Sequence, residues 1–148
     1  MSNEVTVIGK LIKGYRVASQ PSRDYPYGTI EKQKPFFKKL GLNLDNMYNG
    51  TLNISISPNT FEMFRPEYTF ENVEWTDLHP PETFSFSKCI IKFRGDIYDG
   101  WVYYPHPETK KRHFQDHSKI EIISQLIPNI KYDDEVEIIL NTDEISIR

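Results

Sequence analysis

Residues 84–104 read FSFSKCIIKF-RGD-IYDGWVYY. Two runs rich in aromatic and β-branched residues flank a short turn at residues 94–96, which is typical of a β-hairpin. Similar apolar runs occur at residues 5–12, 120–123 and 135–140. Many short strands with few helical segments predict a mainly β domain, either a small barrel or a sandwich.

Residues 50–57, GTLNISIS, alternate strictly between polar and apolar side chains. Such alternation predicts a half-buried strand with one apolar and one polar face. The apolar face holds Leu52, Ile54 and Ile56, and the polar face holds Thr51, Asn53, Ser55 and Ser57.

One helix is predicted near residues 31–40. Phe36, Phe37 and Leu40 fall on one helical face, Gly41 is a natural stop, and Pro35 is tolerated close to a helix start. Residues 59–81 are predicted to be irregular and are rich in aromatic side chains, and a second short helix is predicted at residues 60–64.

Composition limits the classes of function. The 148 residues suit one domain, and the net charge of −3 argues against a nucleic-acid partner. The single cysteine, Cys89, excludes an internal disulfide and a multi-cysteine zinc site, and its apolar neighbours predict a buried thiol. No apolar run suits a membrane span and no signal peptide is recognised, so we expect a cytoplasmic protein.

Several elements, taken in order, resemble the archaeal-type CTP-dependent riboflavin kinases. They are residues 9–14 between two glycines, LG (40–41) followed by GTLN (50–53), and then Pro105, Thr109, EII (121–123) and DDEV (133–136). GTLN is the specific element among them. The resemblance covers most of the chain and implies a single domain over residues 1–148, a small six-stranded barrel of the cradle-loop type with one or two short helices.

The resemblance also implies an activity: magnesium-dependent transfer of the terminal phosphoryl group of CTP to the ribityl hydroxyl of riboflavin, giving FMN. It places Thr51 and Asn53 at the magnesium ion. It places Thr109 and Glu121 at the flavin, with Glu121 positioning the hydroxyl as the catalytic residue. The implied nucleotide-binding residues are Gly14, Tyr15, Arg16, Leu126, Ile127, Pro128 and Asn129.

The residues themselves support part of this assignment. Thr51 and Asn53 share one strand face and offer neutral oxygens, which suit magnesium when waters and phosphates complete its shell. The alternative is an ordinary polar strand face. A zinc site at His113, His117 and Glu121 would need a helix where the sequence predicts a strand.

Two departures affect the nucleotide side. Residues 14–20, GYRVASQ, keep one glycine where the family has several, and residues 124–129, SQLIPN, lack the family's Ala-Pro. Two functions therefore stay open: a riboflavin kinase, or a non-catalytic module that binds a flavin or another small ligand. A partner-binding domain is a third hypothesis, suggested by the aromatic residues between Phe61 and Trp75.

Overall fold

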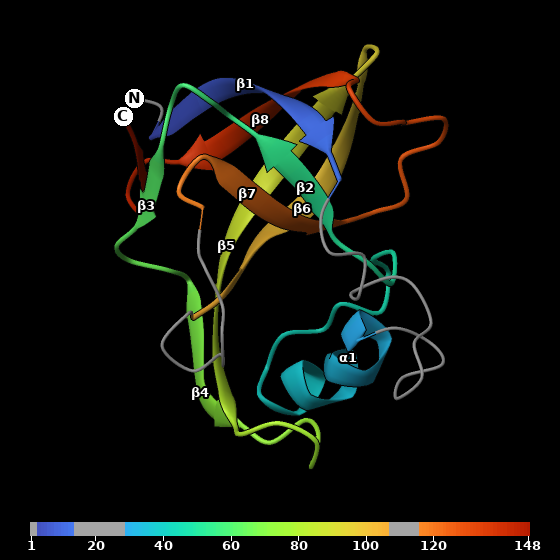
Figure 1. Ribbon diagram of the computed structural model, residues 1–148, viewed down its shortest axis with the longest axis vertical. Helices are drawn as coiled ribbons and strands as arrows, with labels where there is room; N and C mark the ends of the chain where they lie inside the picture. The colour runs from blue at the N-terminus through green and yellow to red at the C-terminus, as the bar shows by residue number, and fades with distance from the viewer. Residues whose placement is uncertain (1–2, 14–28, 107–115) are drawn as a thin grey trace.

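The structure, a computed structural model, describes residues 3–13, 29–106 and 116–148 (Figure 1). In chain order the elements are β1 (Glu4–Ile12), α1 (Thr29–Lys39), β2 (Leu52–Ser55), β3 (Phe61–Met63), β4 (Tyr68–Val73), β5 (Glu82–Phe93), β6 (Asp96–Pro105), β7 (Lys119–Ser124), β8 (Glu135–Asn141) and β9 (Ile145–Ile147).

Six strands close into an antiparallel barrel. They are hydrogen-bonded in the order β5-β6-β7-β2-β1-β8, and β8 pairs again with β5. β4 extends the sheet beyond β5, while β3 and β9 form a separate pair. The predicted small, mainly β barrel is thus confirmed.

The barrel interior is filled by alternate residues of its strands. Ile54, Ile122 and Ile138 are fully buried there, and Cys89 is buried as predicted. Burial raises the pKa of the Cys89 thiol, so this sulfur is an inert core group. At Gly9 the neighbouring strand comes so close that a Cβ would lie 2.3 Å from Ile54 Cγ2, and only glycine fits.

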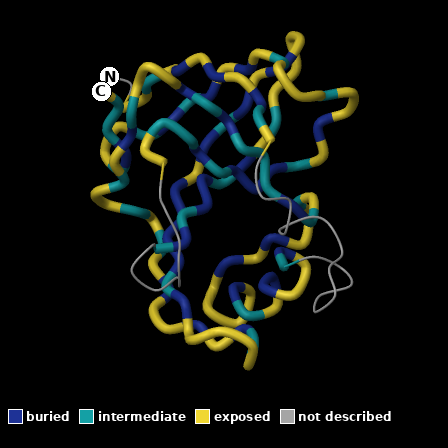
Figure 2. Tube along the Cα trace, viewed as in Figure 1, coloured by how far each residue is buried: buried dark blue, intermediate teal, exposed yellow. Residues whose placement is uncertain are grey.

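A second core lies outside the barrel, where α1 packs against the sheet (Figure 2). Phe37 of α1 makes edge contacts with Phe84 and Phe86 of β5 at ring-centroid distances of 5.1 and 5.0 Å. Ile30 and Phe37 are fully buried. Helix α1 is therefore held on the outer wall of the barrel by aromatic packing.

The predicted helix is confirmed at residues 29–39, and Gly41 follows its end with a φ of +113°. Two details were wrong. Pro35 lies inside the helix instead of near its start, and Leu40 is exposed. The buried face uses Gln33 and Lys34 in place of Leu40, so its centre lies one turn earlier than predicted.

Residues 60–64 are not a second helix. β3 pairs with β9, and Phe61 enters the barrel core, so long-range pairing overrides the local pattern. β4 was also missed, because a bulge between Phe70 and Val73, with Asn72 at a φ of +53°, interrupts its alternation.

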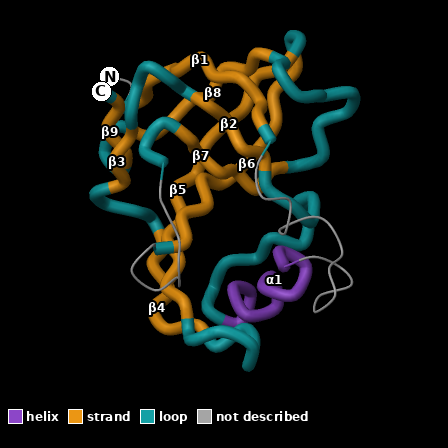
Figure 3. The backbone as a smooth tube through the Cα atoms, in the orientation of Figure 1, coloured by secondary structure: helices purple, strands orange, loops and turns teal. Residues whose placement is uncertain are grey.

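The predicted turn of the β5–β6 hairpin is confirmed: Arg94 and Gly95 both adopt positive φ, as a tight hairpin turn requires. α1 is the one helix in the part of the chain that the structure describes (Figure 3). No helix in that part is long and apolar enough to cross a membrane.

Candidate functional site

Two of the predicted site residues face each other across neighbouring strands. In the β2–β7 ladder, Asn53 is the direct partner of Glu121. The flanking pair Leu52 and Ile122 points into the barrel core, so Asn53 and Glu121 share its outer face. Directly opposite residues hold their Cβ atoms about 4.5–5.5 Å apart. The two side chains can therefore contact a single small ligand.

This outer face continues to α1. Ile123, the next outward residue of β7 after Glu121, is fully buried in the core beneath the helix. Thr51, half-buried, immediately precedes β2 on the Asn53 side. Thr51, Asn53 and Glu121 thus form a polar face, which we call the β2–β7 face, bordering the apolar contact between barrel and helix.

A buried tyrosine links this face to the helix. The Tyr103 hydroxyl on β6 donates a 2.9 Å hydrogen bond to Gln33 Oε1 on α1. Burial raises the pKa of Tyr103 well above its ordinary value, and the carboxylates of Glu121 and Glu82 raise this pKa further. Tyr103 is therefore neutral and lies within electrostatic range of Glu121.

Tyr103 is buried in the core beneath α1, and sequence reasoning missed its partner Gln33. A signal for Gln33 was present. It lies three residues after Ile30 and four before Phe37, on the face of the helix that must pack. A polar residue at such a position needs a buried partner.

The amide of Asn53 is incompletely paired. Its Oδ1 is buried and has no hydrogen-bond partner among the described residues, and the same holds for Asn49 Oδ1. A buried acceptor left unpaired costs about 1–3 kcal/mol, so native proteins rarely keep one without a ligand or water to fill it. Amide carbonyl oxygens are ligands that magnesium accepts, so the donor set at Asn53 fits this ion.

A cluster of ionisable ligands would be a different kind of metal site. Within residues 3–13, 29–106 and 116–148, no group of three or more His, Cys, Asp or Glu side chains could hold a metal ion. His117 is exposed in a turn before β7, Glu121 lies on a strand as predicted, and His113 falls outside the described residues. Any metal at this face would rest chiefly on neutral oxygens.

The predicted nucleotide-binding residues differ in their exposure. Leu126, Pro128 and Asn129 are exposed in the segment after β7, whereas Ile127 is buried in the barrel core, so only its backbone could reach a ligand. Two hydrogen bonds between Gln125 and Asp99 tie this segment to β6. Gly14, Tyr15, Arg16 and Thr109 lie outside the described residues.

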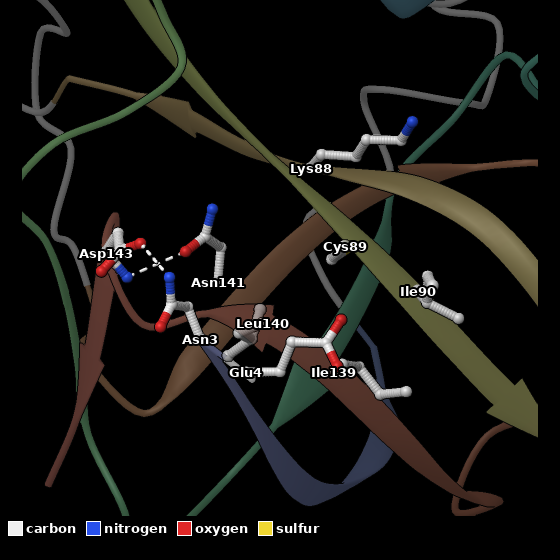
Figure 4. Close-up of a pocket in the computed structure, with 9 residues that line it drawn as sticks. All are labelled: Asn3, Glu4, Lys88, Cys89, Ile90, Ile139, Leu140, Asn141 and Asp143. Atoms are coloured by element: carbon white, nitrogen blue, oxygen red, sulfur yellow. Dashed lines mark hydrogen bonds between the residues drawn. The ribbon is translucent and has the colours of Figure 1, made fainter. Parts of the chain in front are cut away.

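The barrel also has a pocket of about 570 Å³ at the β5–β8 seam, which we call the seam pocket (Figure 4). Asn3 Nδ2 donates to Asp143 Oδ2 at 2.9 Å, and the Asp143 amide donates to Asn141 Oδ1 at 2.8 Å. In the closed strand order this seam lies opposite the β2–β7 seam. The pocket is lined by Asn3, Glu4, Lys88, Cys89, Ile90, Ile139, Leu140, Asn141 and Asp143, none of them a predicted site residue.

The aromatic residues between Phe61 and Trp75, which suggested a partner-binding domain, mostly face inward. Phe61 is buried in the barrel core, and Phe70 and Trp75 are buried in the second core, while Phe64 is exposed. Packing accounts for most of this aromatic segment, which weakens the case for a partner-binding surface.

Comparison with known proteins does not decide between the functional hypotheses. No protein-family model matches the chain, and no curated protein matches it. The resemblance to riboflavin kinases therefore stays a prediction, carried by the GTLN element and by the order of the segments around it.

Proposed function

We propose that this protein binds riboflavin and a nucleoside triphosphate, with CTP as the expected donor, and transfers the terminal phosphoryl group to the ribityl hydroxyl to give FMN. The observation that supports this best is the cross-strand pair of Asn53 and Glu121, in which Asn53 Oδ1 is buried without a partner in residues 3–13, 29–106 and 116–148. The pair combines a neutral oxygen donor with a carboxylate, the two groups that the reaction needs on one face.

Thr51 and Asn53 would hold the magnesium ion. When bound, the ion supplies positive charge that offsets the charge on the transferring phosphoryl group. Because their oxygens are neutral, this charge would be available to the phosphates and not consumed by protein carboxylates.

Glu121 would position the riboflavin hydroxyl. A carboxylate oxygen can accept the hydroxyl hydrogen bond and orient the attacking oxygen toward the phosphate, and it can take the proton as the new bond forms. Tyr103 stays neutral beside it and fixes α1 to the barrel through Gln33. The helix would thereby hold the flavin side of the site at constant geometry.

The direct experiment is incubation with riboflavin, magnesium and each of the four nucleoside triphosphates, followed by chromatographic detection of FMN. We expect FMN to form, fastest with CTP, and to disappear when magnesium is removed by EDTA. Absence of FMN with all four nucleotides would reject the kinase proposal.

A second candidate is a non-catalytic module that binds riboflavin or FMN on the same face. Two observations on the nucleotide side favour it: the single glycine of residues 14–20 and the burial of Ile127. Losing a few backbone-to-phosphate hydrogen bonds, each contributing about 1–2 kcal/mol, would weaken nucleotide binding by tenfold to several hundredfold. Quenching of flavin fluorescence in the absence of FMN formation would support this candidate.

We retain two further expectations from the sequence. The net charge of −3 argues against a nucleic-acid partner, and a cytoplasmic location stays a prediction.

A further inference from the structure

We propose that Asn49 is an additional oxygen donor of the β2–β7 site, beside Thr51 and Asn53. The identity of the ion rests on the function proposed above; the role of Asn49 as a donor rests on its own surroundings. Within the part of the chain that the structure describes, Asn49 Oδ1 is buried and has no hydrogen-bond partner, as is true of Asn53 Oδ1 four residues later.

The backbone around Asn49 is fixed against the end of β7. The Tyr48 amide donates to the Ser124 carbonyl oxygen at 2.8 Å, and the Gly50 amide donates to the Tyr48 carbonyl oxygen at 2.9 Å. These bonds place Asn49 at the β7 end of the ladder in which Asn53 faces Glu121. Asn49 and Asn53 therefore lie on either side of residues 50–52, in one segment that is hydrogen-bonded to β7.

Other turn asparagines of this chain show how a structural asparagine behaves. Asn43 Oδ1 accepts the Asp45 amide at 2.8 Å, and Asn141 Oδ1 accepts the Asp143 amide at 2.8 Å. Both side chains stabilise their own turn, which is the usual reason for asparagine in such a position. The buried oxygen of Asn49 accepts no such bond from any residue that the structure describes, so turn formation does not account for this asparagine.

The chemistry suits a hard cation that also carries phosphate. Magnesium prefers six oxygen ligands and keeps several waters and substrate phosphates, so three neutral protein oxygens leave half of its shell for them. In the proposed site, the hydroxyl of Thr51 and the amide oxygens of Asn49 and Asn53 would form such a set. Such a site would bind magnesium together with a nucleotide more tightly than magnesium alone.

The test uses the full chain with Asn49→Ala, Asn53→Ala and the matched control Asn46→Ala, whose side chain is exposed in the same loop. Manganese, as a probe for magnesium, is titrated with CTP present, and free ion is measured by electron paramagnetic resonance against the same titration of manganese and CTP without protein. We expect both Asn49→Ala and Asn53→Ala to weaken manganese binding by about tenfold or more, the loss of one ligand bond. Asn46→Ala should leave it unchanged.

Thermal unfolding without metal supplies the second readout. Removing an unpaired buried oxygen should leave the melting temperature of Asn49→Ala unchanged or raise it by about 2–4 °C. Asn49→Asp keeps the shape and adds a charge, and should tighten the binding of manganese alone.

The possible results distinguish the role of Asn49 from the proposed function. Normal manganese binding by Asn49→Ala with weakened binding by Asn53→Ala would overturn the role of Asn49 and leave the proposed function intact. A lowered melting temperature for Asn49→Ala would show a structural role instead. No manganese binding by the parent protein with CTP would reject both the site and this donor. If Asn49→Ala does not fold, Asn49→Asp decides, and unchanged binding of manganese alone would count against the proposal.

Discussion

The seam pocket and the β2–β7 face differ in what they offer a ligand. The seam pocket is hollow, about 570 Å³, but its asparagines and Asp143 are hydrogen-bonded to one another. The β2–β7 face carries the buried amide oxygen of Asn53, and the segment just before it carries that of Asn49; neither oxygen has a hydrogen-bond partner among the described residues. None of the unpaired buried atoms among the described residues belongs to a residue that lines the pocket.

This difference shows that a pocket and a set of unpaired polar atoms can lie on opposite walls of one barrel. A hollow whose polar groups already bind one another gains little from a polar ligand. An unpaired buried oxygen, in contrast, lowers the stability of the free protein and gains a bond when a ligand arrives. For this reason we propose the β2–β7 face, and not the seam pocket, as the functional site.

The largest expected effect is at Glu121. Glu121→Gln keeps the size of the side chain but removes the charge that accepts the proton, and we expect kcat for FMN formation to fall by about 100-fold or more. Circular dichroism should be unchanged. The matched control is Glu4→Gln, at the edge of the seam pocket, which should retain full activity. Loss of activity in Glu4→Gln instead would move the site to the seam pocket.

A smaller effect is expected at Asn53. Asn53→Ala removes the unpaired oxygen, and magnesium-dependent nucleotide affinity should fall about tenfold or more without unfolding the protein. Titration calorimetry with CTP and magnesium measures this affinity, and Asn3→Ala in the seam pocket is its control. Equal nucleotide affinity in Asn53→Ala and the parent would mean that Asn53 is not a ligand of the metal.

The barrel itself was predictable because its strands carry strict local patterns. Residues 84–104 and 50–57 alternate, and the Arg94-Gly95 turn has its own signature, so each strand could be identified without knowledge of its partners. β3 and β4 could not be recognised in this way. β3 exists only because β9 pairs with it, and the bulge at Asn72 removes the alternation that would have revealed β4.

The site was predictable only in part. The same-face placement of Thr51 and Asn53 follows from the period of a strand, but the pairing of Asn53 with Glu121 depends on the register of two segments almost 70 residues apart. The unpaired state of Asn49 is a property of three-dimensional burial. No local sequence pattern reports it, because Asn43 and Asn141 look similar in sequence and are satisfied.

Tyr103→Phe should produce a modest loss of stability. The change removes the hydrogen bond to Gln33 and leaves Gln33 Oε1 buried, at a cost of about 1–2 kcal/mol, or about 2–8 °C in melting temperature. Differential scanning calorimetry at neutral pH measures this. A variant as stable as the parent would show that the bond does not hold α1 in place.

The same residue has a pH signature. The folded pKa of Tyr103 is raised above its unfolded value of about 10, so its contribution to stability is present below pH 10 and is lost as the pH rises toward the folded pKa. The parent protein should therefore lose stability more steeply above pH 10 than Tyr103→Phe. If stability fell equally steeply with pH in both proteins, the ionisation of Tyr103 would not contribute to the stability of the fold.

The smallest effect is expected in the seam pocket. Lys88 is exposed there, and Lys88→Ala should change stability by less than about 0.5 kcal/mol and leave the affinities for riboflavin and CTP unaltered. Flavin fluorescence quenching and thermal unfolding provide the two measurements. A clear loss of flavin binding would mean that the hollow, and not the β2–β7 face, holds the ligand.

The most direct measurement is a titration of ¹⁵N-labelled protein with riboflavin, then with CTP and magnesium, followed by amide chemical shifts. We expect the largest changes at Asn53, Glu121 and Gln33, with Asn49 responding when magnesium and nucleotide are added. The seam-pocket amides of Ile90 and Ile139 should stay in place. Shifts concentrated at Ile90 and Ile139, with Asn53 and Glu121 unchanged, would contradict the proposal that ligands bind at the β2–β7 face.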